Sequence, residues 1–452
     1  MNIHSYKLNN NKNVETGKFL TPFISFMSRV RGHMLGGFFF GVFLPSLLFN
    51  LFHEGLRTES ELDNTIIGTS TAFVFGYLIF RKVTALPGFH AAANIVPAFI
   101  LSYGGVAVLY FGLRLDFGRQ EFFLSFIFIS CFFLFLLFYL GRFRRPVLGV
   151  VPFGNAKDIN QITRIAWRRL DTPQDAKKYE HLSLVADLRA PDLPVEWQTF
   201  LADAAVEGRW VFNAKQIKES LTGKVQIEHL AQNPAGHLSP DSLYLPSKFY
   251  VDFLAALIAI IILSPLMLII AIFIRLTSPG PAIFKQKRQG YRGHEFTMYK
   301  FRSMHMEEEL EGGQKGENKD ASQIDSSQSD KTQSGDVRVT SIGKYIRKTR
   351  LDELPQLFNI LKGEMSWIGP RPETVALSQR YETVIPFYRY RHVVRPGITG
   401  WAQVKQGHVI DDVDVSHKLE YDFYYIKNFS IWLDLLILFQ TVKVVVTGYG
   451  AK

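Results

Sequence analysis

Two adjacent acidic residues lie shortly before a rigid, basic turn in the C-terminal half of the chain. The acids are Asp352 and Glu353, which follow a basic, helix-like stretch at 336–350, and the turn is the Gly-Pro-Arg-Pro segment at 369–372. A carboxylate can attack phosphorus as a nucleophile, and a second carboxylate can hold a divalent cation. An arginine fork can neutralise phosphate oxygens. These residue types at this spacing predict phosphate chemistry.

Further basic residues lie in segments on both sides of the acids. The stretch 296–304 alternates apolar and polar residues, as a strand that presents Lys300 and Arg302 would. The stretch 394–404 contains Arg395 among glycines and an amide, and such groups together suit a phosphate or oxyanion site. Each signal alone is also ordinary structure, because an isolated Asp-Glu pair usually lies on a solvated surface and Arg-Pro-Gly is usually only a turn.

The composition indicates a membrane protein of several units. A chain of 452 residues is expected to divide into about three units. Its apolar fraction of 47% is concentrated in five long runs, which distinguishes it from a soluble protein with a rich core. The net charge of +10 fits nucleic acid, anionic lipid or phosphorylated substrates as partners. The single cysteine, Cys131, excludes a disulfide framework and a thiol metal cluster.

Four of the apolar runs are long enough to cross a bilayer. Five Lys and Arg residues precede the first run and three follow the fourth, so the positive-inside rule puts both ends of this block in the cytoplasm. We expect a cytosolic N-terminal segment at 1–33 and a four-helix transmembrane block at 34–145. The four runs are 34–52, 65–80, 90–112 and 121–140.

The fifth apolar run, about 250–276, has Ser264 and Pro265 at its middle. Proline removes a backbone donor and breaks or kinks a helix. Both basic flanks of this run stay in the cytoplasm if the helix enters one leaflet, turns at Ser264-Pro265 and comes back out, with the Ser264 hydroxyl satisfying a backbone group that the proline exposes. A kinked fifth transmembrane helix is the alternative. We favour the re-entrant helix because of the charges.

Residues 146–245 predict a small α/β domain. Strand-like runs at 147–152 and 182–186 alternate with helical patterns at 156–170 and 196–207. The turn after the first strand lacks the G-x-G-x-x-G spacing that close approach to a pyrophosphate needs. We therefore expect a Rossmann-like domain without a dinucleotide, which serves as a spacer or a dimerisation domain.

The segment 307–335 is polar, rich in Ser, Gln, Asp, Gly and Lys, and predicts a mobile loop. It is either a lid over the site or a solvated insertion. We favour the insertion, because nothing in its composition requires closure over a ligand.

Taken in this order, the motifs resemble the bacterial sugar transferase family, the monotopic polyprenyl-phosphate phosphoglycosyl transferases. The additional helices and α/β domain are similar to those of the larger members, often called WbaP-like or WcaJ-like. The resemblance covers about 246–452, the expected catalytic domain. It rests on Ser264-Pro265, Tyr-Lys-Phe-Arg-Ser-Met at 299–304, Leu-Asp-Glu-Leu-Pro-Gln at 351–356, Gly-Pro-Arg-Pro at 369–372, and Arg-Pro-Gly-Ile-Thr-Gly-Trp-Ala-Gln at 395–403.

The resemblance implies a two-step transfer of a sugar phosphate. The Asp of the dyad attacks the sugar-bearing phosphorus of a UDP-hexose, with glucose or galactose expected, and expels UMP. Undecaprenyl phosphate then takes the hexose-1-phosphate, which is the first membrane step of O-antigen, capsule or exopolysaccharide synthesis. Because both substrates are anions, Mg²⁺ and arginines must screen the phosphates before a carboxylate can attack.

The same resemblance implies roles for individual residues. Asp352 would be the nucleophile, and Glu353 would bind Mg²⁺ or align the dyad. Arg371 would hold a phosphate. The remaining implied site residues are the anion contacts Lys300, Arg302 and Arg395, and the members of a further family motif, Glu420 and Asp422.

Two positions depart from the family pattern. Arg350 stands before Leu351 where a small residue is common, and adds a cation near the nucleophile. The Lys-Gln-Gly segment at 405–407 replaces the more usual Asn-Gly and weakens any assignment of the sugar.

The expected fold is thus an α-helical membrane block plus α/β: four transmembrane helices, a small Rossmann-like α/β domain, and a re-entrant membrane helix with a cytosolic, mainly helical phosphoglycosyl transferase domain. We expect a multi-pass protein of the bacterial inner (cytoplasmic) membrane with its catalytic domain on the cytoplasmic face. Its expected partners are a UDP-sugar, undecaprenyl phosphate, the lipid bilayer and a second copy in a homodimer, and no nucleic acid.

Two other functions stay open. The chain would otherwise be a catalytically silent membrane scaffold for polysaccharide assembly, which loss of Asp352 or Arg371 would have favoured. A transporter or flippase should carry ionisable residues within its helices, and the four runs carry essentially none.

Overall fold

The computed structural model describes residues 30–52, 58–84, 91–143, 147–162, 165–226, 244–305, 339–406 and 412–447. The predicted polar loop 307–335 and most of the predicted N-terminal segment 1–33 lie outside these ranges. The chain forms two compact units, Met1–Thr222 and Gly223–Lys452, and each is described by itself.

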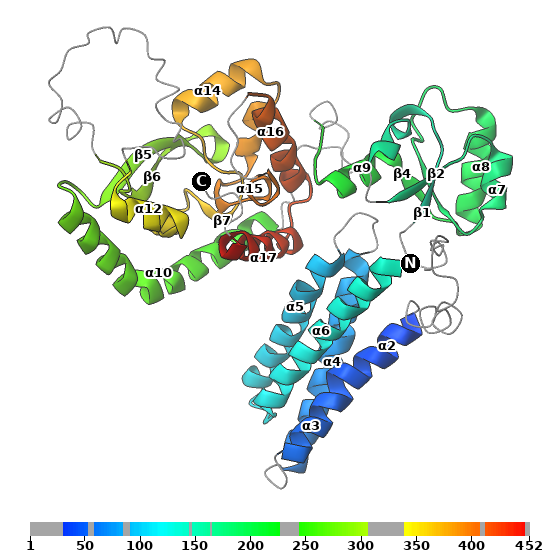
Figure 1. Cartoon of the computed structure of the whole chain (residues 1–452), viewed down its shortest axis with the longest axis horizontal. Coiled ribbons are helices and arrows are strands. Elements are labelled where there is room, and N and C mark those ends of the chain that lie inside the picture. The colour runs from blue at the N-terminus through cyan, green and yellow to red at the C-terminus, as the bar shows by residue number, and fades with distance from the viewer. Residues whose placement is uncertain are drawn as a thin grey trace. The chain divides into compact units, whose positions relative to one another are not determined.

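Within the described ranges, five helical segments are long and apolar enough to cross a membrane: Val30–Phe52, Glu59–Val83, Asn94–Gly112, Arg119–Tyr139 and Tyr244–Thr277. The first consists of α2 (Val30–Phe38), a π-helical turn η2 (Phe39–Phe43) and α3 (Leu44–Phe52). The next three are α4 (Glu59–Val83), α5 (Ala91–Gly112) and α6 (Arg119–Phe143). These apolar N-terminal helices fit a membrane block, as the sequence predicted, and Figure 1 shows them side by side.

Aromatic packing holds this block together. Phe133 on α6 is fully buried, and six rings, five from the neighbouring helices and one from Phe132 of α6 itself, lie with their centroids 5.2 to 6.4 Å away. Glycines let the backbones approach, because a Cβ at Gly76 would lie 2.5 Å from the Phe99 ring. In hydrocarbon, such close packing replaces the hydrophobic driving force between helices. The six rings belong to His33, Phe73, Tyr77, Phe80, Phe99 and Phe132.

The α/β part of the first unit is a four-stranded, wholly parallel sheet in the order β2-β1-β3-β4. Its strands are β1 (Val147–Val150), β2 (Ala166–Arg169), β3 (Ser183–Ala186) and β4 (Val211–Asn213). The helices are α7 (Pro173–Lys178), α8 (Val195–Val206) and α9 (Ala214–Thr222). The helix predicted at 196–207 is confirmed as α8, and the two predicted strands are confirmed as β1 and β3.

The helix predicted at 156–170 is wrong. This segment forms two short 3-10 turns, η3 (Gly154–Ala156) and η4 (Ile159–Gln161), and then strand β2. The prediction followed apolar residues spaced by three, Ile159, Ile162 and Ile165, which imitate one helix face. They instead pack into one core cluster from turns and a strand start, because β2 must pair with β1.

Hydrogen-bond donors in the loops that follow β1 and β3 bind a carboxylate of the chain itself. The buried carboxylate of Asp187 accepts hydrogen bonds from the backbone N–H and side-chain amide of Asn155, at 3.0 and 2.8 Å, and from the backbone N–H of Arg189 at 3.1 Å. In doubly wound sheets this edge is where ligands bind. Here a carboxylate of the chain lies among those donors.

The second unit begins with the 34-residue helix α10 (Tyr244–Thr277), which bends part-way along its length (Figure 1). Pro265 lacks the N–H that would bond Ile261 O, and the Ser264 hydroxyl donates to that same oxygen at 3.1 Å. The two halves of α10 pack against the same unit. Ala256 joins the core around Met298 and Leu357, and Ile274 joins the core around Phe301 and Ile346.

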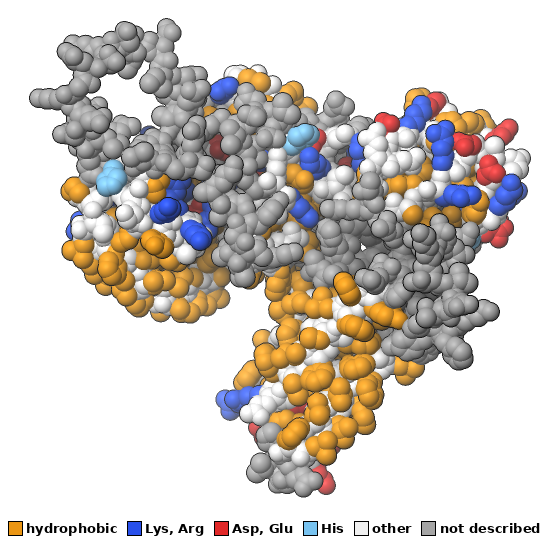
Figure 2. Space-filling view, viewed as in Figure 1, with side chains coloured by type: hydrophobic (Ala, Val, Ile, Leu, Met, Phe, Trp, Pro, Cys, Tyr) orange, Lys and Arg blue, Asp and Glu red, His pale blue; other side chains and the backbone are white. Residues whose placement is uncertain are grey.

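The opposite face of α10 is apolar and exposed. Hydrophobic side chains gather over this helix in Figure 2. Leu254, Ile261, Ile262 and Leu268 are more than half exposed, which in water would be an unfavourable surface. A lipid environment removes that cost.

The rest of the second unit is mainly helical, with two small two-stranded sheets. The antiparallel hairpin β5–β6 and the parallel pair β7–β8 frame the segments that carry the predicted site. The elements are β5 (Ile283–Gln289), β6 (Glu295–Phe301), α12 (Ser341–Lys348), η7 (Leu351–Gln356), α13 (Leu357–Leu361), β7 (Ser366–Ile368), α14 (Val375–Val384), η8 (Tyr388–Val393), β8 (Gly397–Thr399), α15 (Trp401–Gln406), α16 (Asp412–Lys427) and α17 (Ile431–Thr447).

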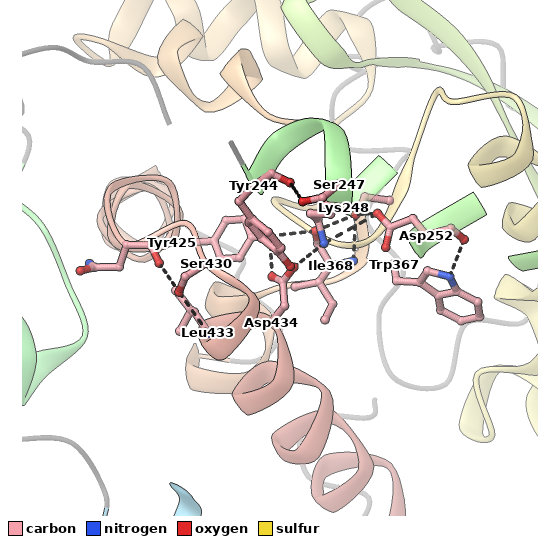
Figure 3. Close-up of polar contacts among 12 residues, drawn as sticks. Tyr244, Ser247, Lys248, Asp252, Trp367, Ile368, Tyr425, Ser430, Leu433 and Asp434 are labelled. Atoms are coloured by element: carbon pink, nitrogen blue, oxygen red, sulfur yellow. Dashed lines mark hydrogen bonds and ion pairs between the residues drawn. The ribbon is translucent and has the colours of Figure 1, made fainter. Parts of the chain in front are cut away.

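A buried polar network ties the start of α10 to β7 and α17 (Figure 3). Lys248 Nζ donates to Asp434 Oδ2 at 2.5 Å and lies 3.7 Å from Asp252 Oδ2. Tyr425 donates to Asp434 Oδ1 at 2.8 Å and contacts Ile368 O at 3.0 Å. Ile368 directly precedes the 369–372 turn. This network therefore fixes the position of the turn relative to the start of α10.

Candidate active site

The Asp-Glu dyad lies on the 3-10 helix η7, between α12 and α13. Arg350, the residue directly before η7, has φ 58°. This is the left-handed region, which costs a non-glycine residue on the order of 1 kcal/mol. Leu351 and Leu354 pack into the core of the second half of α10. This anchoring leaves Asp352 and Glu353 buried, with 9% and 6% of their surface exposed.

Glu353 is held by three cations through a single oxygen. Its Oε1 accepts a hydrogen bond from Arg371 Nη2 at 2.8 Å and lies 3.6 Å from both Lys300 Nζ and Arg350 Nη1. Burial alone would raise the pKa of Glu353. The charges of Arg371, Lys300 and Arg350 outweigh burial and lower this pKa to about 2. Glu353 is therefore ionised at neutral pH.

Asp352 differs from its neighbour. Among the described residues, its buried Oδ1 has no hydrogen-bond partner. Burial, and then the charge of Glu353, raises the pKa of Asp352, and the nearby Lys300 and Arg371 oppose this. A carboxylate that is buried without partners is costly to hold, so such a group is kept for a ligand or for reaction. The two acids thus divide into an anchored one and a reactive one.

The pKa of Lys300 is lowered towards neutral pH. Burial, and then the charge of Arg371, lowers the pKa of Lys300 to about 8, although Glu353 and Asp352 act in the opposite direction. The lysine is positive below this pH and neutral above it. If this charge is needed for phosphate binding, the activity should fall as the pH rises through the pKa of Lys300.

We expect kcat/KM to fall as pH rises above about 8, because Lys300 then loses its proton in the free protein. In the Lys300→Arg variant this fall should move to higher pH, since a guanidinium stays protonated. Steady-state rates from pH 6 to 10 measure both profiles. The control is Lys287→Arg on the exposed face of β5, where the side chain is 76% exposed. Alkaline limbs that coincide in all three proteins would exclude Lys300 as the titrating group.

The backbone that carries Arg371 is fixed at four successive carbonyl oxygens. Pro370 O accepts from Gly397 N–H at 3.0 Å, and Glu373 O from Gln289 N–H at 3.1 Å. Arg371 O accepts from Arg391 Nη2 at 2.9 Å, and Pro372 O from Arg288 Nη1 at 3.2 Å. Two prolines in this segment offer no N–H. Hydrogen bonds to its carbonyl groups therefore hold the segment so that the Arg371 guanidinium reaches Glu353.

Four residues predicted for the site make other contacts. The guanidinium of Arg302 is buried and donates to Ser278 O, Ser278 Oγ and Pro279 O, just after α10. Arg395 donates to Gly363 O at 2.9 Å, and its guanidinium lies 4.8 and 5.0 Å from the ring centroids of Phe249 and Tyr291. Phosphate-binding roles for Arg302 and Arg395 stay predictions.

The two acids of the further motif also have partners. Glu420 lies 3.0 Å from His417 Nδ1 and 3.3 Å from Lys224 Nζ. Asp422 accepts from Arg391 Nη2 at 2.9 Å and is 2% exposed. Of the two, only Asp422 is connected to the Arg371 segment, through Arg391.

The sequence reading missed the ion pairs behind the site. Arg391 was not singled out, although it lies four residues before Arg395. Glu373, which follows the 369–372 turn, pairs with Lys418 Nζ at 2.5 Å. Burial alone would raise the pKa of Glu373, but Lys418 and Arg391 lower it to about 2. The only available signal was a surplus of basic residues in 388–392.

The donor set fits a Mg²⁺ ion that takes most of its ligands from elsewhere. Within the described ranges, no three or more His, Cys, Asp and Glu side chains gather around one point. Mg²⁺ commonly binds through one or two carboxylates plus substrate phosphates and water. The unpartnered Oδ1 of Asp352 is one such oxygen. Glu353, the predicted ligand, makes its cation contacts through Oε1.

Comparison with known proteins agrees with this site. A family model described as bacterial sugar transferase matches residues 243–448, the range that holds α10 and the dyad. The chain is 44% identical over 391 residues to a UDP-N-acetylgalactosamine-undecaprenyl-phosphate N-acetylgalactosaminephosphotransferase of Aeromonas hydrophila, which covers 86% of this chain and 88% of that protein. The chain belongs to the bacterial sugar transferase family. The resemblance seen in the sequence is confirmed.

Two further relatives match over less than half of this chain. A UDP-glucose:undecaprenyl-phosphate glucose-1-phosphate transferase of Xanthomonas campestris pv. campestris is 38% identical over 221 residues, 48% of this chain and 42% of that protein. An undecaprenyl-phosphate galactose phosphotransferase of Salmonella typhimurium is 39% identical over 201 residues, 44% of this chain and 40% of that protein.

Proposed function

We propose that this chain transfers a hexose-1-phosphate from a UDP-sugar to undecaprenyl phosphate and releases UMP. The observation that carries the proposal is the dyad itself. Asp352 has a buried oxygen without a hydrogen-bond partner in the part of the chain that the structure describes, and Glu353 beside it is held by Arg371, Lys300 and Arg350. Relatives that transfer N-acetylgalactosamine, glucose and galactose phosphates to the same lipid support it.

The proposed reaction has two displacements at one phosphorus. A carboxylate oxygen of Asp352 bonds to the sugar-bearing phosphorus, and the bond from that phosphorus to the bridging oxygen breaks, so UMP leaves with the electron pair. An oxygen of undecaprenyl phosphate then attacks the same phosphorus and returns the carboxylate. The products are UMP and a sugar diphosphate on the polyprenol, and no oxidant or reductant is needed.

The positive groups lower the repulsion between a carboxylate and a diphosphate. The charges of Lys300 and Arg371 act on both acids, and both cations pair with Glu353. Mg²⁺, held by the dyad and the donor phosphates, would supply further charge neutralisation. Burial of Asp352 favours reaction because water does not solvate the nucleophile.

The donor sugar is the least constrained part of the proposal. Glucose and galactose are expected from the sequence resemblance, and the relative that matches over most of both chains adds N-acetylgalactosamine. The test is UMP release by the purified protein with Mg²⁺ and undecaprenyl phosphate, with each of the three UDP-sugars in turn. Release with one donor supports the proposal and identifies the sugar. No release with any of them would favour the scaffold function instead.

We also propose that α10 is re-entrant and that the catalytic unit faces the cytoplasm of the bacterial inner membrane. The packing of both halves of α10 on one unit supports this, as does the bend in Figure 1. The basic flank after α10 supports it too. The site would then lie at the level of the lipid headgroups, where the phosphate of the acceptor lies.

Cysteine labelling distinguishes the re-entrant helix from a kinked spanning helix. Both variants are made in a Cys131→Ser background. Ser247→Cys places an exposed thiol in the first turn of α10, and Lys285→Cys places one in β5, just after the other end of α10. We expect neither to react with an impermeant maleimide in intact spheroplasts, and both to react once the membrane is opened. Asp116→Cys, between α5 and α6, is the control that should react in intact spheroplasts. Reaction of Lys285→Cys alongside Asp116→Cys would establish a spanning helix.

For the α/β part of the first unit we propose a Rossmann-like domain that binds no dinucleotide and supports a homodimer. The parallel order β2-β1-β3-β4 supports the fold, and the carboxylate of Asp187 among the loop donors supports the lack of a phosphate site. Light scattering of the detergent-solubilised chain tests the dimer, and a monomer mass would refute it.

A further inference from the structure

One guanidinium in the second unit bridges three segments that are distant in sequence. Arg391 Nη2 donates to Arg371 O and to Asp422 Oδ2, both at 2.9 Å, and Arg391 Nη1 donates to Tyr388 OH at 2.7 Å. The side chains of Arg391 and Asp422 are 3% and 2% exposed. This ion pair therefore lies behind the Arg371 segment and out of reach of solvent.

We propose that Arg391 and Asp422 are positioning residues, which hold the backbone of Arg371 so that its guanidinium stays on Glu353 beside Asp352. The inference rests on the proposed phosphoglycosyl transfer and assigns two residues to it. Neither would touch the substrate, and both would act through Arg371.

The local backbone explains why such a device is needed. Arg371 stands between Pro370 and Pro372, which have no N–H groups, so hydrogen bonds from these two neighbours cannot fix the segment. The segment is held instead at its carbonyl oxygens, and the donor to the carbonyl oxygen of Arg371 itself is Arg391. Without a fixed backbone, a long arginine side chain must order itself anew for each turnover, at an entropic cost.

Asp422 orients the guanidinium of Arg391. A buried guanidinium needs its donors satisfied, and one carboxylate oxygen on Nη2 sets the plane of the group. Glu373 adds a weaker attraction, with its Oε1 3.9 Å from Arg391 Nη1. Asp422 lies on α16, about 50 residues along the chain from Arg371. The pair thus connects α16 to the dyad through Arg371.

The pair is an unsuitable candidate for direct chemistry. Asp422 accepts from Arg391, and Nη1 and Nη2 of Arg391 donate to Tyr388, Arg371 and Asp422. The Nε of Arg391 has no hydrogen-bond partner among the described residues, but it is buried. A substrate phosphate would have to displace buried hydrogen bonds to reach either side chain. Positioning is the role that leaves these bonds in place.

The test is a double-mutant cycle between Asp422→Asn and Arg371→Lys, read as steady-state UMP release. In the wild-type background we expect Asp422→Asn to lower kcat by about 10- to 100-fold, as loss of an outer partner of a site residue does, with a smaller change in KM. In the Arg371→Lys background the same change should cost less than about threefold, since the positioned group is already lost. Asp422→Glu, which keeps the charge, should retain most of the wild-type kcat.

A purely structural pair predicts a different pattern. Asp422→Asn would then lower the activity by the same factor in both backgrounds, and this outcome would overturn the proposal. Asp187→Asn, which alters a buried carboxylate of the first unit, is the control that should combine additively with Arg371→Lys. If Asp422→Asn does not fold, Arg391→Lys replaces it in the same cycle. UMP release by the wild type tests the proposed function separately.

Discussion

Replacing Asp352 by asparagine should abolish the sugar-phosphate adduct and lower UMP release on the order of 10³-fold or more. The amide has nearly the same shape but cannot act as a carboxylate nucleophile. It should not damage the fold, because Asp352 Oδ1 has no partner among the described residues and the change removes a buried charge. The melting temperature should therefore stay equal or rise.

Intact mass spectrometry measures the adduct after incubation with Mg²⁺ and a UDP-sugar, with the lipid acceptor omitted. The wild type should gain one hexose-phosphate, and so should Glu295→Gln, which makes the same chemical change at an exposed site of the same unit. An adduct on Asp352→Asn would assign the nucleophile to another residue. UMP release without any adduct would indicate direct transfer between the two substrates.

Replacing Arg371 by glutamine should lower kcat/KM on the order of 10²-fold, the usual cost of removing one preorganised group that stabilises developing charge. It should also destabilise the second unit by about 3 kcal/mol, because a buried carboxylate loses its closest cation. That carboxylate is Glu353, whose Oε1 lies 2.8 Å from Arg371 Nη2. Lys287→Gln, which removes an exposed cation, should change neither quantity.

The destabilisation by Arg371→Gln should depend on pH with a definite sign. The pKa of Glu353 in the folded chain, about 2, lies below its ordinary value of 4.5. Its ionisation therefore stabilises the fold above about pH 4.5, and this contribution is lost as the pH falls towards 2. The destabilisation by Arg371→Gln should therefore be full above about pH 4.5 and shrink as the pH falls towards 2, because the variant has already lost the contribution that acid removes from the wild type. Melting curves between pH 3 and 7 test this, and parallel curves would exclude the Arg371–Glu353 pair as the cause.

The dyad and the turn at 369–372 could be singled out from the sequence because their signals are local. Adjacent acids, prolines around an arginine and a proline within an apolar run are each visible within a few residues. Strand alternation also predicted that Lys300 and Arg302 lie on one face. However, β6 ends at Phe301, so Arg302 leaves the strand and binds the carbonyl groups that follow α10.

Contacts between distant segments could not be predicted in this way. The Arg391–Asp422 pair joins η8 to α16, and its partner oxygen belongs to the turn at 369–372. No spacing rule links these three places, because their proximity depends on how the helices pack. The false helix at 156–170 has a related cause: apolar residues spaced by three fit a helix, but pairing between β1 and β2 decided the conformation.

The bend of α10 has a consequence for the fate of the product. If both arms enter from one side, the unit draws its acceptor from a single leaflet and returns the sugar diphosphate to that same leaflet, with its headgroup in the cytosol. Sugars added later by cytosolic enzymes could then reach the growing chain without further movement. Passage of the finished glycan across the bilayer becomes a separate energetic problem, which is solved after this chain has released its product.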